Sequence, residues 1–116
     1  MSATSPPEVA SPRLVQVAAV ADVPVGWVLK VRAGSRELAL ARNQDGFFAM
    51  DNSCPHAGGP LGDTRLKEGC FVECPWHNSV FDVGTGAVVR GPARKELRTH
   101  DVTVQDGMVF VAMPEA

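Results

Sequence analysis

The sequence lacks an excess of basic charge. Eleven Lys and Arg residues stand against thirteen Asp and Glu residues, which gives a formal net charge of -2 at pH 7. A chain with this balance has no broad positive field to attract nucleic acid or the surface of an anionic membrane. We therefore expect neither of these as a partner.

Long apolar runs and a secretion signal are also missing. No stretch approaches the roughly 20 apolar residues that a membrane-spanning helix needs, and the N-terminus does not show a basic segment followed by an apolar one. Residues 1–12 contain three serines and three prolines, which leaves few side chains to bury. We expect a flexible tail over 1–12 and a single domain over 13–116.

Cysteines are few and odd in number, which argues against a secreted framework of disulfides. The chain has three, and two of them belong to the motif described below. Thiols that must stay free as metal ligands favour a reducing compartment, so we expect a cytoplasmic protein. The third, Cys70, is interpreted as a small apolar residue at the start of a strand.

No segment shows sustained helical periodicity, and no internal repeat is present. Trp27, Leu29 and Val31 alternate with more polar neighbours, as in a half-buried strand, and Leu38 and Leu40 continue the alternation. Turn residues separate such segments every few residues, which predicts an all-β sandwich or barrel-like stack. Strands are expected near 14–17, 27–32, 38–42, 47–51, 71–73, 80–83, 87–90, 102–104 and 108–113, with one helical turn near 18–22.

Two short motifs carry the chemistry of the chain. Cys-Pro-His occupies residues 54–56, Cys-Pro-Trp-His occupies residues 74–77, and seventeen residues separate His56 from Cys74. Two thiols and two imidazoles from two loops supply the ligands of a small metal centre. The alternatives are a structural zinc ion and a two-iron cluster.

The distribution of ligands between the loops bears on this choice. Zinc fingers place both cysteines in one knuckle and both histidines in another, whereas each loop here carries one of each. One thiolate and one imidazole from each loop suit a cluster in which one iron takes the cysteines and the other takes the histidines. Zinc remains the plainer alternative, and analysis for metal and labile sulfide separates the two.

With these spacings, the sequence resembles the Rieske family of [2Fe-2S] proteins over roughly residues 14 to 113. Residues 79–82, 84–86 and 91–93 also follow the family's downstream pattern. The resemblance implies stacked antiparallel β-sheets with a cluster-binding subdomain inserted at one end, at about 52–93. It also implies one [2Fe-2S] cluster per chain, held by Cys54, His56, Cys74 and His77.

The same resemblance places further residues around the cluster. Ser79 occupies the position where high-potential members direct a hydroxyl at a cluster sulfide, and Phe81 stands where those members have a tyrosine. Pro92 belongs to a third loop that covers the cluster. Trp76 stands where those members have one of two bridging cysteines and would screen the cluster from water. The balance resembles the soluble, lower-potential Rieske ferredoxins.

Two residues next to these motifs have plainer interpretations. Asn78 stands where the family usually has glycine, and asparagine tolerates a left-handed backbone better than most residues. His100, the only histidine outside the motif, is interpreted as a surface or structural residue.

The resemblance implies an electron carrier that is not itself an enzyme. Such a ferredoxin takes single electrons from a flavoprotein reductase that uses NAD(P)H and passes them to a terminal ring-hydroxylating dioxygenase. With a single histidine outside the motif, the chain has too few ligands for the mononuclear iron of an oxygenase. The alternative is the small Rieske subunit of an NAD(P)H-dependent nitrite reductase. Because one-electron carriers dock transiently, we expect a monomer.

Overall fold

The structure is a computed structural model that describes residues 13–53, 61–76 and 78–113. Within these residues it contains eleven β-strands and one short 3-10 helix, η1, at Val20–Asp22. The strands are β1 (Arg13–Ala19), β2 (Trp27–Ala33), β3 (Arg36–Asn43), β4 (Gly46–Asp51), β5 (Thr64–Arg65), β6 (Phe71–Glu73), β7 (Val80–Asp82), β8 (Val88–Arg90), β9 (Thr99–His100), β10 (Val102–Gln105) and β11 (Met108–Met113).

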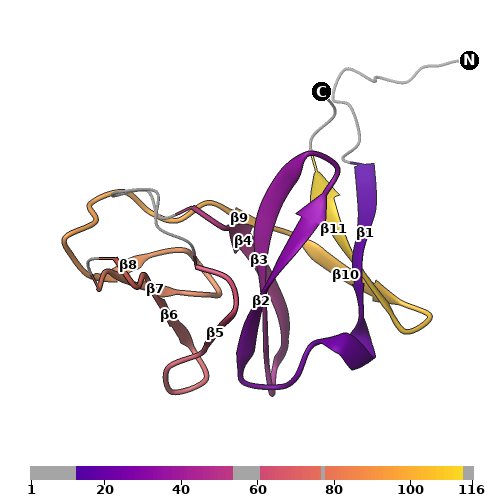
Figure 1. Ribbon diagram of the computed structural model, residues 1–116, viewed down its shortest axis with the longest axis horizontal. Helices are drawn as coiled ribbons and strands as arrows, with labels where there is room; N and C mark the ends of the chain where they lie inside the picture. The colour runs from indigo at the N-terminus through magenta and orange to yellow at the C-terminus, as the bar shows by residue number, and fades with distance from the viewer. Residues whose placement is uncertain (1–12, 54–60, 77, 114–116) are drawn as a thin grey trace, which may run out of the picture.

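These strands form three sheets whose pairings are antiparallel. The orders are β1-β11-β10, β5-β2-β3-β4-β9 and β6-β7-β8. Figure 1 shows the β6-β7-β8 sheet at one end of the long axis, with β1, β10 and β11 at the other. The predicted all-β fold of stacked antiparallel sheets is confirmed.

Most predicted hairpins are present, and the errors fall on short or terminal elements. The arms at 71–73 and 108–113 are confirmed, and the turn at 106–107 joins β10 to β11. Extended structure continues to Ala19, so the predicted helical turn shrinks to η1. The strands β5 and β9 were not predicted, because strands of two residues are too short to show alternation.

The central sheet is buried on both faces, which corrects the expectation of half-buried strands. On β3, Leu38 and Leu40 pack against residues of β1 and β11, while Ala39 and Ala41 pack on the opposite side beneath the β6-β7 hairpin. Val28 of β2, which alternation assigned to the more polar side, is fully buried in the same way. A second layer covers the face that an isolated sheet would expose to water.

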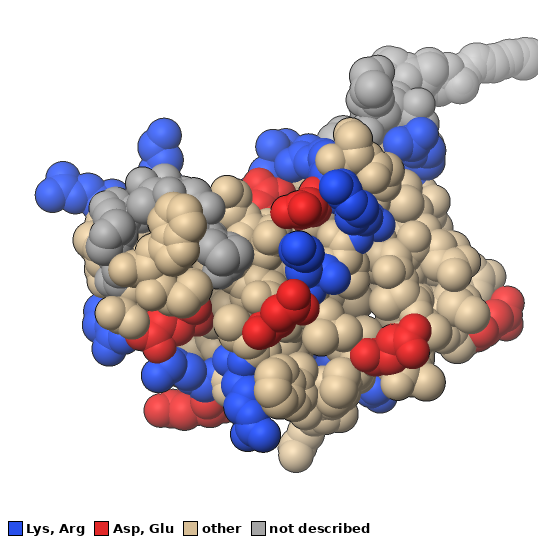
Figure 2. Space-filling view, in the orientation of Figure 1, with Lys and Arg blue, Asp and Glu red and all other residues tan. Residues whose placement is uncertain are grey.

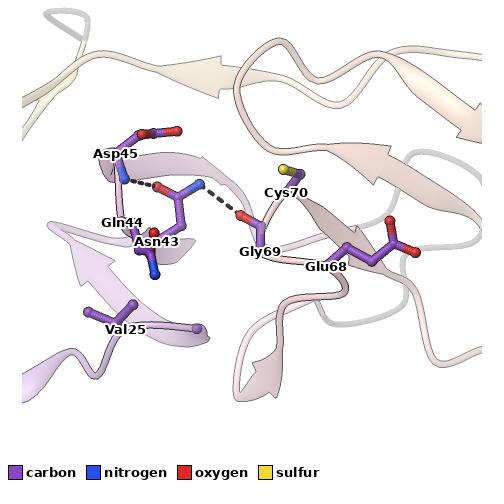
Figure 3. Close-up of a pocket in the computed structure, with 8 residues that line it drawn as sticks. Val25, Asn43, Gln44, Asp45, Glu68, Gly69 and Cys70 are labelled. Atoms are coloured by element: carbon purple, nitrogen blue, oxygen red, sulfur yellow. Dashed lines mark hydrogen bonds between the residues drawn. The ribbon is translucent and has the colours of Figure 1, made fainter.

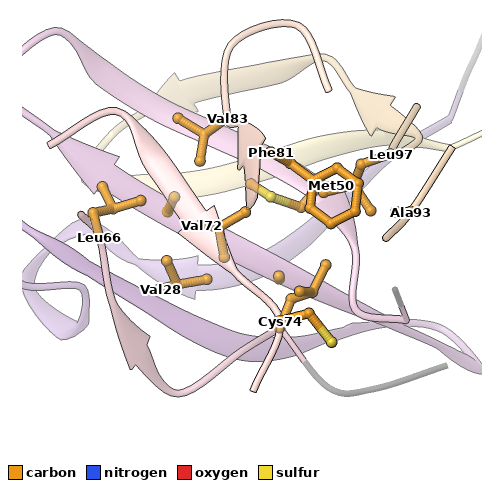
Figure 4. Packing of buried hydrophobic residues seen from close by; sticks show 12 residues of the cluster. Val28, Met50, Leu66, Val72, Cys74, Phe81, Val83, Ala93 and Leu97 are labelled. Atoms are coloured by element: carbon orange, nitrogen blue, oxygen red, sulfur yellow. The ribbon is translucent and has the colours of Figure 1, made fainter. Parts of the chain in front are cut away.

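A group of apolar side chains beneath the β6-β7 hairpin fixes the position of the end of the molecule predicted to bind the iron–sulfur group. Phe81 of β7 and Val72 of β6 are fully buried, and they share this cluster with Met50 of β4 and Leu97 (Figure 4). The hairpin therefore rests on the central sheet through side chains that exclude water. No helix among the described residues is long and apolar enough to cross a membrane.

Candidate metal centre

Of the four predicted ligands, the structure describes Cys74 alone. Cys54, His56 and His77 lie outside the described residues. Cys74 directly follows β6, and its side chain is buried at the edge of the apolar cluster, with the sulfur pointing away from Val72 (Figure 4). Because Cys74 directly follows a paired strand, the backbone that carries its thiol is held in place for metal coordination.

Two backbone hydrogen bonds close the loop that begins at Cys74. The Cys74 N–H donates to the carbonyl oxygen of Ser79 over 2.8 Å, and the Asn78 N–H donates to the carbonyl oxygen of Cys74 over 2.9 Å. The loop between β6 and β7 is thus held at its neck. Its two ends are thus tied together beside the paired strands β6 and β7.

Asn78 is held in place by hydrogen bonds of its side-chain amide and of its carbonyl oxygen. Its backbone is left-handed, with φ 63°, so the prediction that asparagine adopts a left-handed turn here is confirmed. Its side-chain amide donates to Glu73 Oε2 over 2.8 Å, and its carbonyl oxygen accepts from Arg90 Nη2 over 3.3 Å. Asn78 directly precedes Ser79, so these bonds set the path of the chain out of the loop.

Glu73 joins the hairpin to its neighbours through a small ionic network. Its carboxylate lies 2.9 Å from Lys67 Nζ and 3.1 Å from Arg90 Nη2. The hydrogen bond from Lys67, helped by Asn78 and Arg90, lowers the pKa of Glu73, although partial burial acts in the opposite direction. Glu73 is therefore ionised near neutral pH, and cations on both sides balance its charge beside Cys74.

Ser79 connects the second loop to the third. The residue is fully buried, and its Oγ accepts a hydrogen bond from the Ala93 N–H over 2.9 Å. A serine hydroxyl that accepts one bond still has its own proton to donate. The predicted neighbours differ in exposure: Trp76 is 56% exposed and Pro92 is exposed, whereas Phe81 is fully buried.

Asn52 holds together the two chain segments that flank residues 54–60. Its Oδ1 accepts from the N–H groups of Leu61 (3.2 Å) and Gly62 (2.7 Å), and its carbonyl oxygen accepts from Leu61 over 2.9 Å. Asn52 is buried, with 8% exposure. Sequence reasoning missed this residue, and the available signal was an asparagine placed two residues before Cys54.

Comparison with protein families decides the nature of the site. Residues 13–101 match the Rieske [2Fe-2S] domain. The chain belongs to the Rieske family. A Rieske domain carries one [2Fe-2S] cluster, so the predicted cofactor is confirmed and the structural zinc ion is excluded as the family's cofactor.

Two Rieske relatives of similar length are ferredoxins. The chain is 33% identical over 99 residues to the ferredoxin component of the naphthalene 1,2-dioxygenase/salicylate 5-hydroxylase systems of Ralstonia sp., covering 85% of this chain and 94% of the relative. Its fold matches the ferredoxin of carbazole 1,9a-dioxygenase from Nocardioides aromaticivorans IC177, with TM-score 0.80, 30% identity and coverage of 86% and 97%.

A third relative comes from an assembled Rieske system. One chain in the complex of reduced oxygenase and oxidized ferredoxin in carbazole 1,9a-dioxygenase matches with TM-score 0.79 and 32% identity. The match covers 89% of this chain and 96% of that one.

The described part of the Rieske site fits a cluster of this kind. A buried thiol follows the hairpin, and the hydroxyl of Ser79 keeps a proton for a nearby acceptor. Backbone hydrogen bonds close the neck of the second loop, and Asn52 closes the ends that flank the first. Ligands presented from supported loops are what a small inorganic cluster needs.

Two residues that sequence analysis left outside the Rieske motif have structural surroundings of their own. His100 has 5% side-chain exposure, and its Nε2 lies 2.9 Å from Asp51 Oδ1, which confirms a satisfied structural histidine. Cys70 directly precedes β6 as expected, but its thiol is exposed, so its assignment as an apolar packing residue is wrong. It lines a pocket of about 420 Å³ together with Asn43 and Asp45 (Figure 3).

Proposed function

We propose that this chain is the ferredoxin component of an aromatic ring-hydroxylating dioxygenase system. It takes single electrons from an NAD(P)H-dependent flavoprotein reductase and delivers them to a terminal oxygenase. The observation that carries this proposal is coverage: the chain spans 94% of the Ralstonia ferredoxin component and 97% of the Nocardioides ferredoxin. Those relatives are electron-transfer components, and this chain is likewise not a catalytic subunit.

The proposed ligands are Cys54 and Cys74 on one iron, and His56 and His77 on the other. When bound, the cluster accepts and releases one electron. Around it, Ser79 offers a hydroxyl proton, while the ring of Phe81 contributes only apolar packing. Trp76 and Pro92 belong to the second and third loops and limit the access of water.

The proposal includes a simple organisation of the protein. Residues 13–116 form one Rieske domain, with a cluster-binding subdomain at about 52–93 and a tail at 1–12. The carrier acts in the cytoplasm. It acts as a monomer, because fast turnover requires contacts with its redox partners that release after one electron. Transient redox interfaces of this kind bury less than about 1,200 Å².

Metal analysis tests the ligand assignment. Purified protein should contain two irons and two acid-labile sulfides per chain, as a single binuclear cluster requires. Alanine at any of the four ligand positions should abolish or severely deplete the cluster, whereas Cys70→Ser should leave iron and sulfide content intact. Stoichiometric zinc without sulfide, or loss of the cluster only in Cys70→Ser, would overturn the assignment.

The midpoint potential tests the place of the protein in an electron chain. Rieske centres range from about -150 to +300 mV, and a carrier that receives electrons from a reduced flavin belongs in the lower part of that range. Protein-film voltammetry measures this directly. A midpoint near the top of the range would remove the case for a dioxygenase ferredoxin.

A further inference from the structure

We propose that residues 90–98 form a basic docking edge that selects redox partners with an acidic surface around their own electron-transfer site. The inference rests on the proposed function, because it concerns how the carrier meets its partners. It goes beyond that function in naming a surface and the charge of the partner that fits it.

The charge of the chain is distributed unevenly along its sequence. Residues 90–98 contain four basic residues and one acidic residue, whereas the rest of the chain contains seven basic and twelve acidic residues. Neither residues 54–60 nor residues 74–79 contain Asp, Glu, Lys or Arg. The uncharged residues of the two ligand motifs are therefore accompanied by one segment with a local excess of three positive charges.

The 90–98 segment is fastened to the supports of both ligand loops. At its start, Arg90 bonds the carbonyl oxygen of Asn78, and the Ala93 N–H donates to Ser79 Oγ. At its end, the carbonyl oxygen of Arg98 accepts from the Asp51 N–H over 3.0 Å, at the end of β4. The segment thus runs from the second ligand loop to the strand that leads into the first.

Three of its cations are unpaired among the residues that the structure describes. Arg90 is neutralised by Glu73, but the side chains of Arg94, Lys95 and Arg98 are exposed and make no ion pair or hydrogen bond there. Figure 2 shows Lys and Arg side chains projecting from the left end of the molecule, where Figure 1 places β6, β7 and β8.

These observations identify the partner by its charge. Unpaired surface cations contribute little to folding, but they attract an oppositely charged surface over about one Debye length and raise the rate of productive encounter. A chain with a net charge of -2 would otherwise favour cationic partners. The 90–98 segment reverses that preference locally, beside the loops through which electrons pass.

Small redox reagents of opposite charge test the docking edge. The reduced protein gives one electron to hexacyanoferrate(III), a trivalent anion, or to tris(phenanthroline)cobalt(III), a trivalent cation, and each metal is reduced by one unit. We expect the rate with the anion to fall as salt is added, and the rate with the cation not to fall. The opposite pattern, which net charge alone predicts, would overturn the inference.

Matched variants localise the effect. Arg94→Gln/Lys95→Gln should lower the rate with the anion by roughly fivefold at low salt, from the attraction of two charges at about 10 Å with partial screening. The control Thr103→Glu/Gln105→Glu makes the same change in net charge at exposed positions on β10, at the other end of the molecule. It should change that rate by less than about twofold. Equal effects in the two variants would show that only net charge matters.

A binding measurement keeps this inference separate from the proposed function. Hexacyanochromate(III), a paramagnetic and redox-inert trivalent anion, should broaden the backbone amide NMR signals of residues 94–98 in the wild type and not in the double Gln variant. Broadening centred elsewhere, or absent, would overturn the docking edge even if the protein carries electrons. Failure to bind a cluster would contradict the proposed function, whereas broadening that lies elsewhere in cluster-loaded protein would contradict the docking edge alone.

Discussion

Ser79 is the residue at which structure and electron-transfer chemistry meet most directly. It is fully buried, and its Oγ already accepts the Ala93 N–H, so its remaining capacity is that of a donor. A donor aimed at a cluster sulfide stabilises the reduced form, whose sulfides carry more negative charge, and so raises the midpoint potential. We therefore expect this one side chain both to anchor Ala93 and to tune the site.

Ser79→Ala should therefore lower the midpoint potential. A hydrogen bond to a charged group is worth roughly 1.5–3 kcal/mol, and 1.4 kcal/mol is about 60 mV for a one-electron couple, so a shift of tens of millivolts up to about 100 mV is expected. Voltammetry on the cluster-loaded variant measures it, with Ser35→Ala in the exposed turn after β2 as control. Lower thermal stability with an unchanged potential would show that the hydroxyl serves only the Ala93 N–H.

Phe81→Tyr should move the potential in the opposite direction. The ring is fully buried beside Met50 and Leu97, and the added hydroxyl needs a partner to avoid the cost of an unpaired buried polar group. If the sulfide accepts it, the potential rises by tens of millivolts and stability is kept. A lower melting temperature at constant potential would place the phenol in the apolar core, away from the cluster.

For single residues, the sequence predicted those whose role depends on a short local motif. Asn78 is an example, because the family resemblance implies a glycine at this position and asparagine tolerates the same left-handed backbone. Asn52 was missed because its role depends on the N–H groups of Leu61 and Gly62, nine and ten residues away. The exposure of Cys70 was missed for a similar reason, since it depends on neighbouring turns that the pattern does not place.

Among the elements, the turn between β7 and β8 supports the 90–98 segment. Gly86 has a left-handed backbone with φ 80°, and its N–H donates to Asp82 while its carbonyl oxygen accepts from the Leu97 N–H. A Cβ at this position would lie 2.0 Å from the carbonyl oxygen of Leu97. Glycine is required here both by backbone conformation and by close approach.

Gly86→Ala should be strongly destabilising. The left-handed backbone costs roughly 1–2 kcal/mol for a residue with a Cβ, and displacing the Leu97 backbone adds about 1–3 kcal/mol. Gly107→Ala is the matched control, because Gly107 has φ 78° and nothing lies within 4 Å of an added Cβ. Thermal unfolding should show a drop of roughly 10 °C or more for the first variant and clearly less for the second. Similar drops would mean that the backbone at Leu97 shifts freely.

The arrangement of the whole molecule shows where sequence patterns reach their limit. The period of two located the strands, and the ligand spacing located the loops. The pattern did not predict that the central sheet is covered twice, with Leu38 and Leu40 on one side and Ala39 and Ala41 on the other. Alanines are too weakly hydrophobic for the sequence pattern to mark a buried face. The second layer follows only from the position of the β6-β7 hairpin in the structure.

This double-sided arrangement divides the apolar core into two clusters, and we expect their stability to depend differently on the metal. Among the residues that the structure describes, the apolar cluster beneath β6 and β7 includes the predicted ligand Cys74, and the apolar cluster formed with β1 and β11 includes none. The β6-β7-β8 sheet consists of strands of three residues each, while β1 and β11 have seven and six. Metal-binding energy is folding energy where ligands come from loops on so small a scaffold.

Removal of the iron–sulfur cluster should therefore loosen the end of the molecule that contains β6, β7 and β8 before the end that contains β1 and β11. Iron is removed with a chelator, without acidifying the sample, and amide hydrogen exchange is then measured. Protection should be lost in β6, β7 and β8, because their sheet is short and its ligand loop no longer holds a metal. Amides in β1 and β11 should keep most of theirs, since Val109 and Val111 remain fully buried in the second cluster. Cys70→Ser protein treated in the same way serves as control and should behave like the wild type. A uniform loss of protection through all three sheets would show that the cluster stabilises the fold as one cooperative unit, and that the two apolar clusters are not independent.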